Sequence, residues 1–451
     1  MNMREACPLR EIGCVTIGFA LSLIHSSVCA VFFLLLLFLL QQRIVGCLKG
    51  LLIVTTRGIL STAIGAEVSG LASNVKWILI FVFSLYILFY QKHEQTDYNQ
   101  LKCHNTLFLL IGLFAVYNII SSLITGSYPV ISAFKIISYA IPFLAVTMGV
   151  SLTNNQVDWA EYCYLMLTPV IIVSVIVIPF GYFKIVNDSF QGIINHPNLF
   201  GIFGAIYICF LLYSNYSFRR KSGLDWKRIV LLVLTFVMIY LTESRTGMFS
   251  ALVILLIYFI TMNTESKIKL FAGLMVFAVI LIIYFAVDNN AYRGFIDEIN
   301  HFIIKRENAE GIMDTREQLM EASMNKFRAN PLFGSGFGVG YTPSIKSFEF
   351  SMEMTYESGN LYTTLLGDTG VLGLAFFALY MGYILLQTKP KKWMLFIAPI
   401  IISLGEMAFF STNNIAIYYF VMLGICICKT EEDTQSAVEY HSTGIQRRTI
   451  S

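Results

Sequence analysis

The chain has 451 residues and a formal net charge of +3, and 56% of its residues are hydrophobic while only 13% are charged. Together with a mean hydropathy of +0.69, this composition excludes a soluble globular domain, whose core needs far fewer apolar residues. The small net charge says little about partners.

Apolar runs of about 18 to 27 residues, long enough for a helix to cross a bilayer, recur along the chain. The predicted spans are residues 14–40, 74–91, 106–125, 132–151, 160–180, 197–214, 228–243, 247–262, 268–287, 360–387, 393–411 and 413–428. We therefore predict an all-α, polytopic integral membrane protein of about 12 transmembrane helices. The first run is too long for the apolar region of a signal peptide, and no small-residue cleavage site follows it, so we interpret it as an anchor.

Residues 44–66 are ambiguous, because Lys49 and Arg57 interrupt an otherwise apolar run. They form either a thirteenth span or a helix at the membrane interface. If they do not cross the bilayer, the N-terminus with Arg4 and Arg10 is cytoplasmic, as the charge rule favours. If they do cross, the N-terminus is external.

Lys and Arg concentrate in two loops, and such residues are retained on the cytoplasmic side of a membrane. They are Arg219, Arg220, Lys221, Lys227 and Arg228 in the first loop, and Lys389, Lys391 and Lys392 in the second. Counting spans outward from either loop places residues 181–196, 243–247 and 287–357 on the external face.

No cysteine lies in residues 287–357, where an oxidising compartment would permit a disulfide. No cluster of His and Cys has spacing suited to a metal. We therefore expect the nine thiols to serve apolar packing, and we expect no metal site.

One long insertion, residues 287–357, interrupts the apolar pattern, and we expect the chemistry there. About 18 of its roughly 70 residues are charged, although a loop that only connects two spans needs few residues. Apolar side chains at helical spacing over residues 292–303 predict a short amphipathic helix. A second helix is predicted from its cap at Asp314 to the stop at Asn330-Pro331. Its inner stripe consists of Leu319, Met320, Ser323 and Phe327.

Four glycines alternate after this second helix: Gly334, Gly336, Gly338 and Gly340. No strand precedes them and no Lys-Ser or Lys-Thr follows, so the pattern does not predict a phosphate-binding P-loop. We interpret it as a re-entry loop whose backbone approaches the spans closely.

Local structure does not explain two arginines. Arg316 stands in the first turn of the second predicted helix, where a cation opposes the helix dipole at a cost of roughly 0.3 to 1 kcal/mol. A bound anion would offset that cost; a surface pair with Asp314 or Glu317 is the alternative. Arg245 lies in the external hairpin 243–247, against the usual charge asymmetry, and we favour a functional role over snorkelling to the headgroups.

A recognisable pattern begins at the end of the insertion: Glu357-Ser358-Gly359-Asn360, then nine residues, then Gly370-Val371-Leu372-Gly373. It resembles the signature of the O-antigen ligase and O-antigen polymerase family, whose ligases carry His-Asn, nine residues and Gly-x-x-Gly at this place. The resemblance extends to Ser244-Arg245-Thr246-Gly247, to His196-Pro197-Asn198, and to Arg316 upstream of Asn330-Pro331-Leu332-Phe333-Gly334-Ser335-Gly336. It covers roughly residues 190–375, while the N-terminal half contributes only hydropathy.

The family implies an enzyme that handles sugar chains on undecaprenyl diphosphate at the outer face of the bacterial inner membrane, without nucleotide, metal or other cofactor. Gly359 occupies the position of the ligase histidine and cannot accept or donate a side-chain proton. A polymerase of O antigen, capsule or exopolysaccharide repeat units, with O antigen favoured, therefore fits better than a ligase acting on the lipid A core.

A lipid-linked oligosaccharide flippase or other transporter is the alternative from another class. Transporters commonly have two related halves with broken helices at matching positions. Here the only large predicted loop falls late in the chain and has no counterpart in the first half.

In a polymerase the acceptor hydroxyl attacks the anomeric carbon and the diphosphate leaves, which requires cations and a general base. Arginine binds phosphate oxygens bidentately, so Arg245 and Arg316 are the expected diphosphate ligands. Glu357 is the expected base, with Glu349 and Glu353 as competitors. We expect further substrate contacts from His196, Asn198, Arg293, Arg306 and Asn360.

Asp368 and Glu406 lie inside predicted spans, where each must face a partner or a polar cavity. We assign neither a chemical step. The expected partners of the protein are undecaprenyl-diphosphate-linked glycans, membrane lipids, and a chain-length regulator and a flippase of the same pathway, with no nucleic acid.

The sequence thus predicts four regions. They are an N-terminal transmembrane bundle (1–286), a large external loop (287–357), C-terminal transmembrane helices (358–429) and a cytoplasmic tail (430–451).

Overall fold

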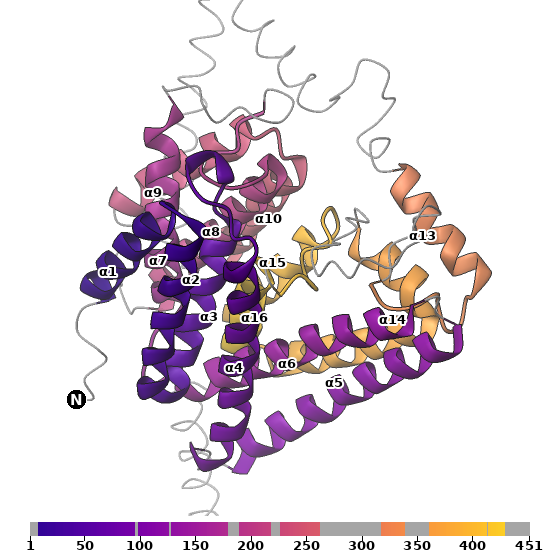
Figure 1. Ribbon diagram of the computed structural model, residues 1–451. Coiled ribbons are helices and arrows are strands. Elements are labelled where there is room, and N and C mark those ends of the chain that lie inside the picture. Colours follow the sequence, from indigo (N-terminus) through magenta and orange to yellow (C-terminus); the bar gives the residue numbers. More distant parts are fainter. Residues whose placement is uncertain are drawn as a thin grey trace, which may run out of the picture.

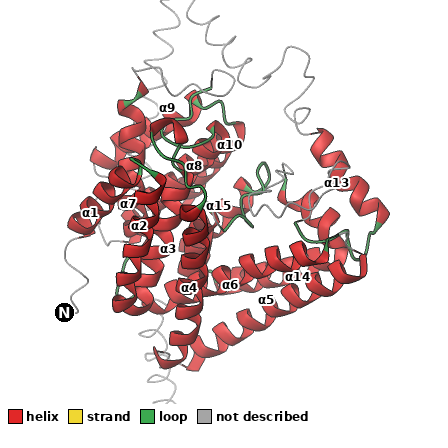
Figure 2. Ribbon diagram, in the orientation of Figure 1, coloured by secondary structure: helices red, strands yellow, loops and turns green. Residues whose placement is uncertain are grey.

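The computed structural model describes residues 8–94, 98–125, 128–178, 189–217, 226–261, 317–338, 360–412 and 414–428. Every regular element in these residues is a helix, and an isolated bridge pairs Leu60 with Ile194. The all-α prediction is confirmed (Figures 1 and 2).

Seven helical stretches of the described residues are long and apolar enough to cross a membrane, so the chain is an integral membrane protein. They are Ser26–Ile59, Leu71–Gln91, Gln100–Thr125, Pro129–Thr153, Trp159–Ile176, Pro197–Ser214 and Leu361–Gln387. Two shorter apolar helices are Arg245–Thr261 and Ala416–Cys426. The total of about 12 spans stays a prediction, because residues 268–287 and most of the loop 287–357 lie outside the described residues.

The first apolar run is broken near its middle. Helix α1 (Pro8–Ser22) ends before His25, and α2 (Ser26–Leu35) begins after it. His25 caps α2, since its Nδ1 accepts a hydrogen bond from the backbone N–H of Ser27 at 3.1 Å. The prediction of one span over residues 14–40 is therefore wrong, because hydropathy does not register a turn made of apolar residues.

The chain then reverses a second time. The 3₁₀ helix η1 (Leu36–Gln42) continues α2, and α3 (Arg43–Ile59) begins at a residue with φ +54°. Near the end of α3, Nε of Arg57 donates to Oγ of Ser22 at 2.6 Å, at the end of α1. Because the ends of α1 and α3 meet, the connecting segment α2–η1 runs antiparallel to both.

This arrangement settles the course of residues 44–66. Residues 44–59 lie in α3, which runs along the bundle beside α4, and residues 60–66 follow its end. Nζ of Lys49 on α3 pairs with Oε2 of Glu11 on α1 at 2.8 Å, so α1 and α3 run in the same direction. The beginning of α1 therefore lies at the same end of the bundle as Arg43, opposite to Ile59.

The remaining helices are α4 (Leu71–Glu94), α5 (Tyr98–Thr125), α6 (Pro129–Thr153), α7 (Trp159–Ile176), α8 (Pro197–Ser217), α9 (Trp226–Leu241), α10 (Arg245–Thr261), α13 (Glu317–Ala329), α14 (Leu361–Gln387), α15 (Trp393–Ile402) and α16 (Ala416–Cys426). In Figure 1, α5, α6 and α14 lean away from the main bundle to one side, and α13 lies at their far end. Helix α6 connects the two groups, because it packs on α4, α5 and α16.

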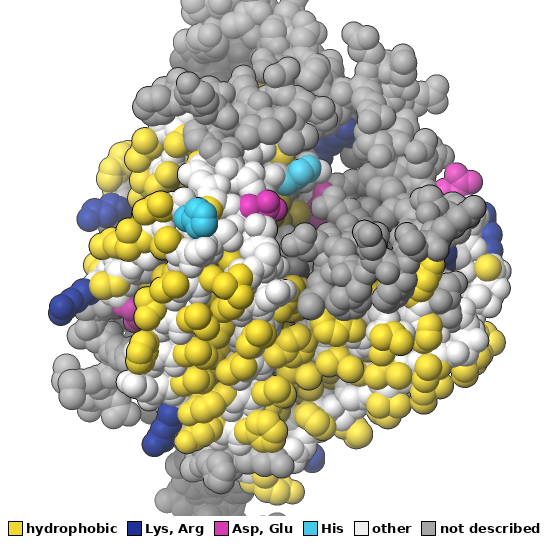
Figure 3. Space-filling view, in the orientation of Figure 1, with side chains coloured by type: hydrophobic (Ala, Val, Ile, Leu, Met, Phe, Trp, Pro, Cys, Tyr) yellow, Lys and Arg dark blue, Asp and Glu magenta, His cyan; other side chains and the backbone are white. Residues whose placement is uncertain are grey.

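An aromatic cluster fills the interior around α6. The ring of Tyr139 on α6 contacts Phe114, Phe143, Phe409, Phe410 and Phe420, and its hydroxyl bonds to that of Tyr380 on α14 at 2.8 Å. The outer surface is also apolar: Leu386 is 84% exposed and Phe89 is 73% exposed. Figure 3 shows the hydrophobic side chains, in yellow, as a broad band with the charged side chains mostly toward its margins, as expected for a surface that faces lipid.

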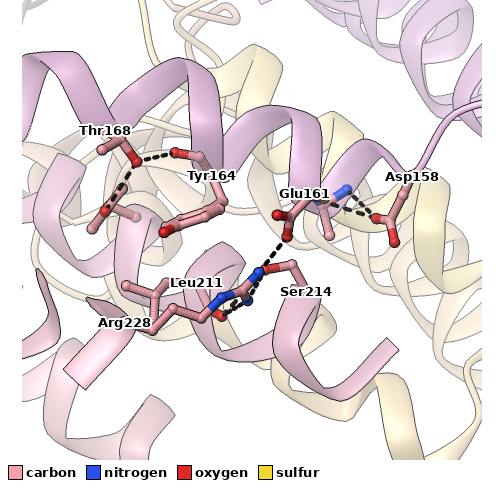
Figure 4. A network of polar contacts seen from close by, with 9 residues as sticks. Asp158, Glu161, Tyr164, Thr168, Leu211, Ser214 and Arg228 are labelled. Carbon is pink, nitrogen blue, oxygen red and sulfur yellow. Dashed lines mark hydrogen bonds and ion pairs between the residues drawn. The ribbon is translucent and has the colours of Figure 1, made fainter. Parts of the chain in front are cut away.

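A polar network ties α7, α8 and α9 together at the end of the bundle away from Asn360 (Figure 4). Nη2 of Arg228 on α9 pairs with Oε2 of Glu161 on α7 at 2.7 Å, and Nη1 donates to Oγ of Ser214 and to the carbonyl of Leu211 on α8. The guanidinium also lies over the ring of Tyr164 at 4.7 Å. Arg228 therefore belongs to the interior of the bundle as well as to the predicted cytoplasmic loop.

Burial also affects the second predicted cytoplasmic loop. The side chain of Lys392 is buried, and its Nζ donates to the carbonyl of Cys428 at 2.7 Å. Burial lowers the pKa of Lys392. The contact attaches the end of α16 to the start of α15.

We predict the labelling pattern of cysteines placed singly in a variant without its native cysteines. His25→Cys and Asn195→Cys should react with a membrane-impermeant maleimide from the same side, and Lys391→Cys from the opposite side. His25 lies next to the loop before α4, because Oγ of Ser26 donates to the carbonyl of Ser69, and Asn195 lies beside the end of α3, because its N–H donates to Ile59. An unreactive cysteine at position 25 would contradict the break between α1 and α2.

Candidate functional site

Arg245 stands in the first turn of α10, directly after the hairpin from α9. The local sequence favours a helix start here, because Oγ of Ser244 accepts the N–H of Gly247 at 3.2 Å. The hairpin turns at Glu243, whose φ is +53°, and Oγ of Ser189 donates to Oε2 of Glu243 at 3.1 Å. Arg245 itself is half-buried.

The hairpin packs directly on the beginning of α8. A Cβ atom on Gly247 would lie 2.5 Å from the backbone of Gly201, and one on Gly201 would lie 2.2 Å from Cβ of Ser244. Small residues on both helices therefore allow the two backbones to touch. This contact brings Arg245 close to the first turn of α8, which carries Asn198.

His196 and Asn198 shape the start of α8. Nδ1 of His196 accepts the N–H of Asn198 at 3.2 Å, so the imidazole caps the helix. The side chain of Asn198 is half-buried. This hydrogen bond gives His196 a role at the start of the helix, and its expected contact with substrate stays a prediction.

The turn between α15 and α16 joins Arg245 to Asn360. A Cβ on Gly405 would lie 2.0 Å from Oγ1 of Thr246, so the turn lies against the residue after Arg245. The preceding carbonyl, that of Leu404, accepts a hydrogen bond from Nδ2 of Asn360 at 2.9 Å. In Figure 1 this turn, drawn in yellow, lies between α10 and α14.

Asn360 is the N-cap of α14. Its Oδ1 accepts the N–H groups of Tyr362 at 2.8 Å and Thr363 at 3.3 Å. The starts of α8, α10 and α14, which the sequence singled out separately, thus meet through a continuous series of contacts.

Glu406 adds a carboxylate to this region. It follows Gly405 directly and is only 8% exposed. It interacts electrostatically with Tyr419, whose hydroxyl oxygen is buried and has no hydrogen-bond partner among the described residues. The sequence pattern gave Glu406 no chemical role.

The second predicted helix of the insertion is confirmed over the described residues as α13 (Glu317–Ala329), which ends before Asn330-Pro331 as expected. Of the predicted inner stripe, Ser323 is buried, and Met320 and Phe327 are half-buried. Its expected cap, Asp314, lies outside the described residues, as does the predicted helix 292–303.

The glycine loop after α13 packs on a kink in α14. Gly334, Gly336 and Gly338 all have positive φ, and so has Gly370 within α14 (φ +65°). A Cβ on Gly334 would lie 2.3 Å from the backbone of Asp368. The expectation that this loop lets backbone approach the spans closely is confirmed.

Backbone hydrogen bonds hold the loop against the kink. The N–H groups of Ser335 and Gly336 donate to the carbonyls of Gly367 and Asp368 at 3.1 and 2.9 Å, and the N–H of Val371 donates to Pro331 at 2.9 Å. The kink at Gly370 leaves the carbonyls of Gly367 and Asp368 and the N–H of Val371 without their ordinary helical partners, and the loop supplies new ones.

Helix α5 holds the loop from the other side. The hydroxyl of Tyr117 donates to the carbonyl of Leu332 at 3.1 Å, and Oγ1 of Thr125 donates to that of Gly334 at 2.9 Å. Phe337 inserts into the aromatic cluster against Phe114 and Phe410. The loop is therefore part of the packed interior.

The carboxylate of Asp368 has partners, as its position in a span required. Nζ of Lys326 on α13 lies 3.0 Å from Oδ1, and the N–H of Gly338 donates to Oδ2 at 2.9 Å. Lys135 on α6 donates to the carbonyl of Gly338. Sequence reasoning missed Lys326, because a charged residue on an amphipathic helix is ordinarily a solvated one.

The remaining expected site residues lie outside the described residues. These are Arg316, Glu357, Arg293 and Arg306, together with the competing bases Glu349 and Glu353. Within the described residues, no group of three or more His, Cys, Asp or Glu side chains could hold a metal ion.

Residues 230–378 match the model of the family described as O-Antigen ligase. The matched region contains the Arg245 hairpin, α13, the glycine loop and the kink of α14. This matched region, about a third of the chain, is similar to the O-antigen ligase family. The resemblance seen in the sequence is thereby confirmed, and the family indicates a ligase- or polymerase-type, glycosyltransferase-like function in envelope polysaccharide assembly. None of the curated proteins compared with the chain matches it.

We predict that Gly334→Ala destabilises the protein by more than about 1 kcal/mol, because an L residue is unfavourable at φ +73° and its Cβ would collide with α14. Thermal unfolding of the detergent-solubilised protein measures the loss. Gly382→Ala on α14 is the matched control, since a Cβ there would meet no atom within 4 Å. Equal melting temperatures for the two variants would contradict the docking of the loop.

Proposed function

We propose that the protein polymerises undecaprenyl-diphosphate-linked repeat units into a surface polysaccharide, with O antigen as the expected product, at the external face of the bacterial inner membrane. The observation that carries the proposal is the meeting of the Arg245 hairpin, the start of α8 and the cap of α14 in a chain of this family. The glycine at position 359 favours polymerisation over ligation, because a residue without a side chain cannot replace a catalytic histidine.

The reaction forms one glycosidic bond and breaks one bond to phosphate. The acceptor hydroxyl of an incoming repeat unit attacks the anomeric carbon of the growing chain. The bond from that carbon to the diphosphate oxygen breaks, and its electron pair leaves with the lipid diphosphate. The hydroxyl proton passes to a carboxylate, for which Glu357 is the proposed base.

Arg245 suits the diphosphate. Its guanidinium binds phosphate oxygens bidentately and stays charged at any working pH. Its place in the first turn of α10 adds the positive end of the helix dipole, which favours an anion at the same point. Arg316 is the proposed second ligand, with Arg293 and Arg306 in reserve.

The remaining residues shape the acceptor side. His196 fixes the first turn of α8 and so directs Asn198, which we propose as a hydrogen-bonding contact for sugar. Asn360 fixes the first turn of α14 against Leu404, and Glu357 precedes it by three residues in the sequence.

A strain that lacks the gene distinguishes a polymerase from a ligase and from a flippase. We expect loss of the long polysaccharide ladder on a gel, with a single repeat unit on the lipid core retained, because ligation and export continue without polymerisation. Loss of every repeat unit would contradict a polymerase and support a ligase or a flippase.

A second prediction concerns Arg245. Arg245→Ala should lower the rate of polymer formation by about 10²- to 10³-fold, the usual cost of removing one donor to a developing anion. Arg245→Lys should retain part of the activity, since the charge remains but the bidentate geometry is lost. Lys391→Ala, which removes an exposed cation at the other end of the bundle, is the control. A normal ladder from Arg245→Ala protein that reaches the membrane would exclude Arg245 from the mechanism.

A further inference from the structure

Three consecutive apolar residues, Pro331, Leu332 and Phe333, form the turn directly after α13, and we call them the apolar turn. All three are exposed: Leu332 is 58% and Phe333 is 39% exposed. Such a run is unfavourable on a surface that faces water, because each apolar side chain then stays hydrated. The exposure of the apolar turn therefore points to an apolar environment around it.

The backbone of the apolar turn is bonded within the protein. Each of its three carbonyls accepts a hydrogen bond from a membrane helix. The donors are the N–H of Val371 on α14 for Pro331, the hydroxyl of Tyr117 on α5 for Leu332, and the hydroxyl of Ser121 on α5 for Phe333. Carbonyls in hydrocarbon must be bonded in this way, whereas carbonyls in water need no partner from the protein. Bonded carbonyls with exposed apolar side chains are the pattern of a segment that faces lipid.

The level of the apolar turn can be measured along α5. Leu332 bonds to Tyr117, which lies about 12 Å along the helix axis from Thr125, the last residue of α5. Between these two positions α5 exposes large apolar side chains, among them Leu123 and Ile124. They belong to a helix that can cross the membrane, so lipid surrounds them. The apolar turn therefore lies farther from the end of the span than these lipid-facing residues do.

Polarity along α13 changes in the order that a membrane surface requires. Glu321 and Asn325 are exposed on the helix, and the exposed Arg328 follows, about one turn before Leu332. An arginine can reach lipid phosphate while its apolar stem lies against hydrocarbon. Polar residues thus precede the cation, and the cation precedes the apolar turn, which is the order of water, headgroups and acyl chains.

We propose that the apolar turn inserts into the outer leaflet of the bilayer and contacts phospholipid acyl chains, while Arg328 meets the headgroup phosphates. The exposed residues Val371 and Leu372 of α14 lie beside the turn, so its apolar surface continues that of the membrane helices. This contact anchors the end of α13 in the membrane. It does not depend on the proposed function.

The test places a nitroxide label on single cysteines of the full-length protein, in a variant without its native cysteines, in liposomes of phosphatidylethanolamine and phosphatidylglycerol. Collisions of the label with oxygen, which concentrates in the bilayer, and with a water-soluble nickel chelate report its depth. Labels at Leu332→Cys and Phe333→Cys should collide with oxygen and not with nickel, as the lipid reference Ile124→Cys does. The matched control on α13, Glu321→Cys, should collide with nickel, and Arg328→Cys should give an intermediate ratio.

Two results would overturn the proposal. Frequent collision with nickel at position 332 would place the apolar turn in water. A label there that collides with neither reagent would place the turn against another protein segment or a second protein instead of lipid.

A second measurement keeps the native cysteines. Leu332→Asp should lower the melting temperature of the protein in the same liposomes, because it places a carboxylate in hydrocarbon. Asn325→Asp, on the exposed side of α13, should leave the melting temperature unchanged. Equal melting temperatures for the two variants would contradict insertion of the apolar turn.

Discussion

An ionised carboxylate inside an apolar helix must be paired, because taking it out of water costs several kcal/mol. In this protein that constraint falls on Asp368, and its partners come from Lys326 on α13 and from the glycine loop. The loop can reach the helix only because Gly334 and Gly370 have positive φ and no side chain at the contact. One buried charge and a few glycines thus attach α13 and the glycine loop to the membrane helices.

The other half of the site depends on close helix contacts. Gly201 and Gly247 bring α8 and α10 together, and Gly405 brings the α15–α16 turn against Thr246. Asn360 then ties the same turn to α14. Arg245 lies in the midst of these contacts, on a helix start whose dipole also favours an anion. The arrangement suits the proposed reaction, in which a lipid diphosphate departs, and it agrees with the match of residues 230–378 to the model of the O-antigen ligase family.

Hydropathy, together with the glycine and proline residues that end helices, predicted much of the fold. Six of the seven long apolar stretches in the described residues follow from local physical rules that apply whatever the neighbours are, and so do the end of α13 at Asn330-Pro331 and the close approach of the glycine loop. The turn at His25 was missed because its neighbours Leu23 and Ile24 are apolar, so the run of hydropathy is continuous across it. Residues 44–66 were ambiguous because the cost of burying Lys49 and Arg57 is offset by partners on α1. Such tertiary contacts cannot be recognised from the local sequence.

The site was predicted less completely than the fold. Family motifs identified Arg245, Asn198 and Asn360, and the structure brings their segments together. Lys326 and Glu406 were given no role, because nothing in the sequence distinguishes a charge that becomes buried from a solvated one. The sequence showed only that the carboxylate of Asp368 needs a partner. That partner, Lys326, lies 42 residues away in the chain.

The most direct test of the account is reconstitution of the purified protein in proteoliposomes with an undecaprenyl-diphosphate-linked repeat unit as the sole substrate, followed by mass analysis of the glycans. The account predicts glycans of several repeat units, each on one lipid diphosphate, with one undecaprenyl diphosphate released for every bond formed. Repeat units that remain single, or that are transferred only when a lipid A core acceptor is added, would contradict it.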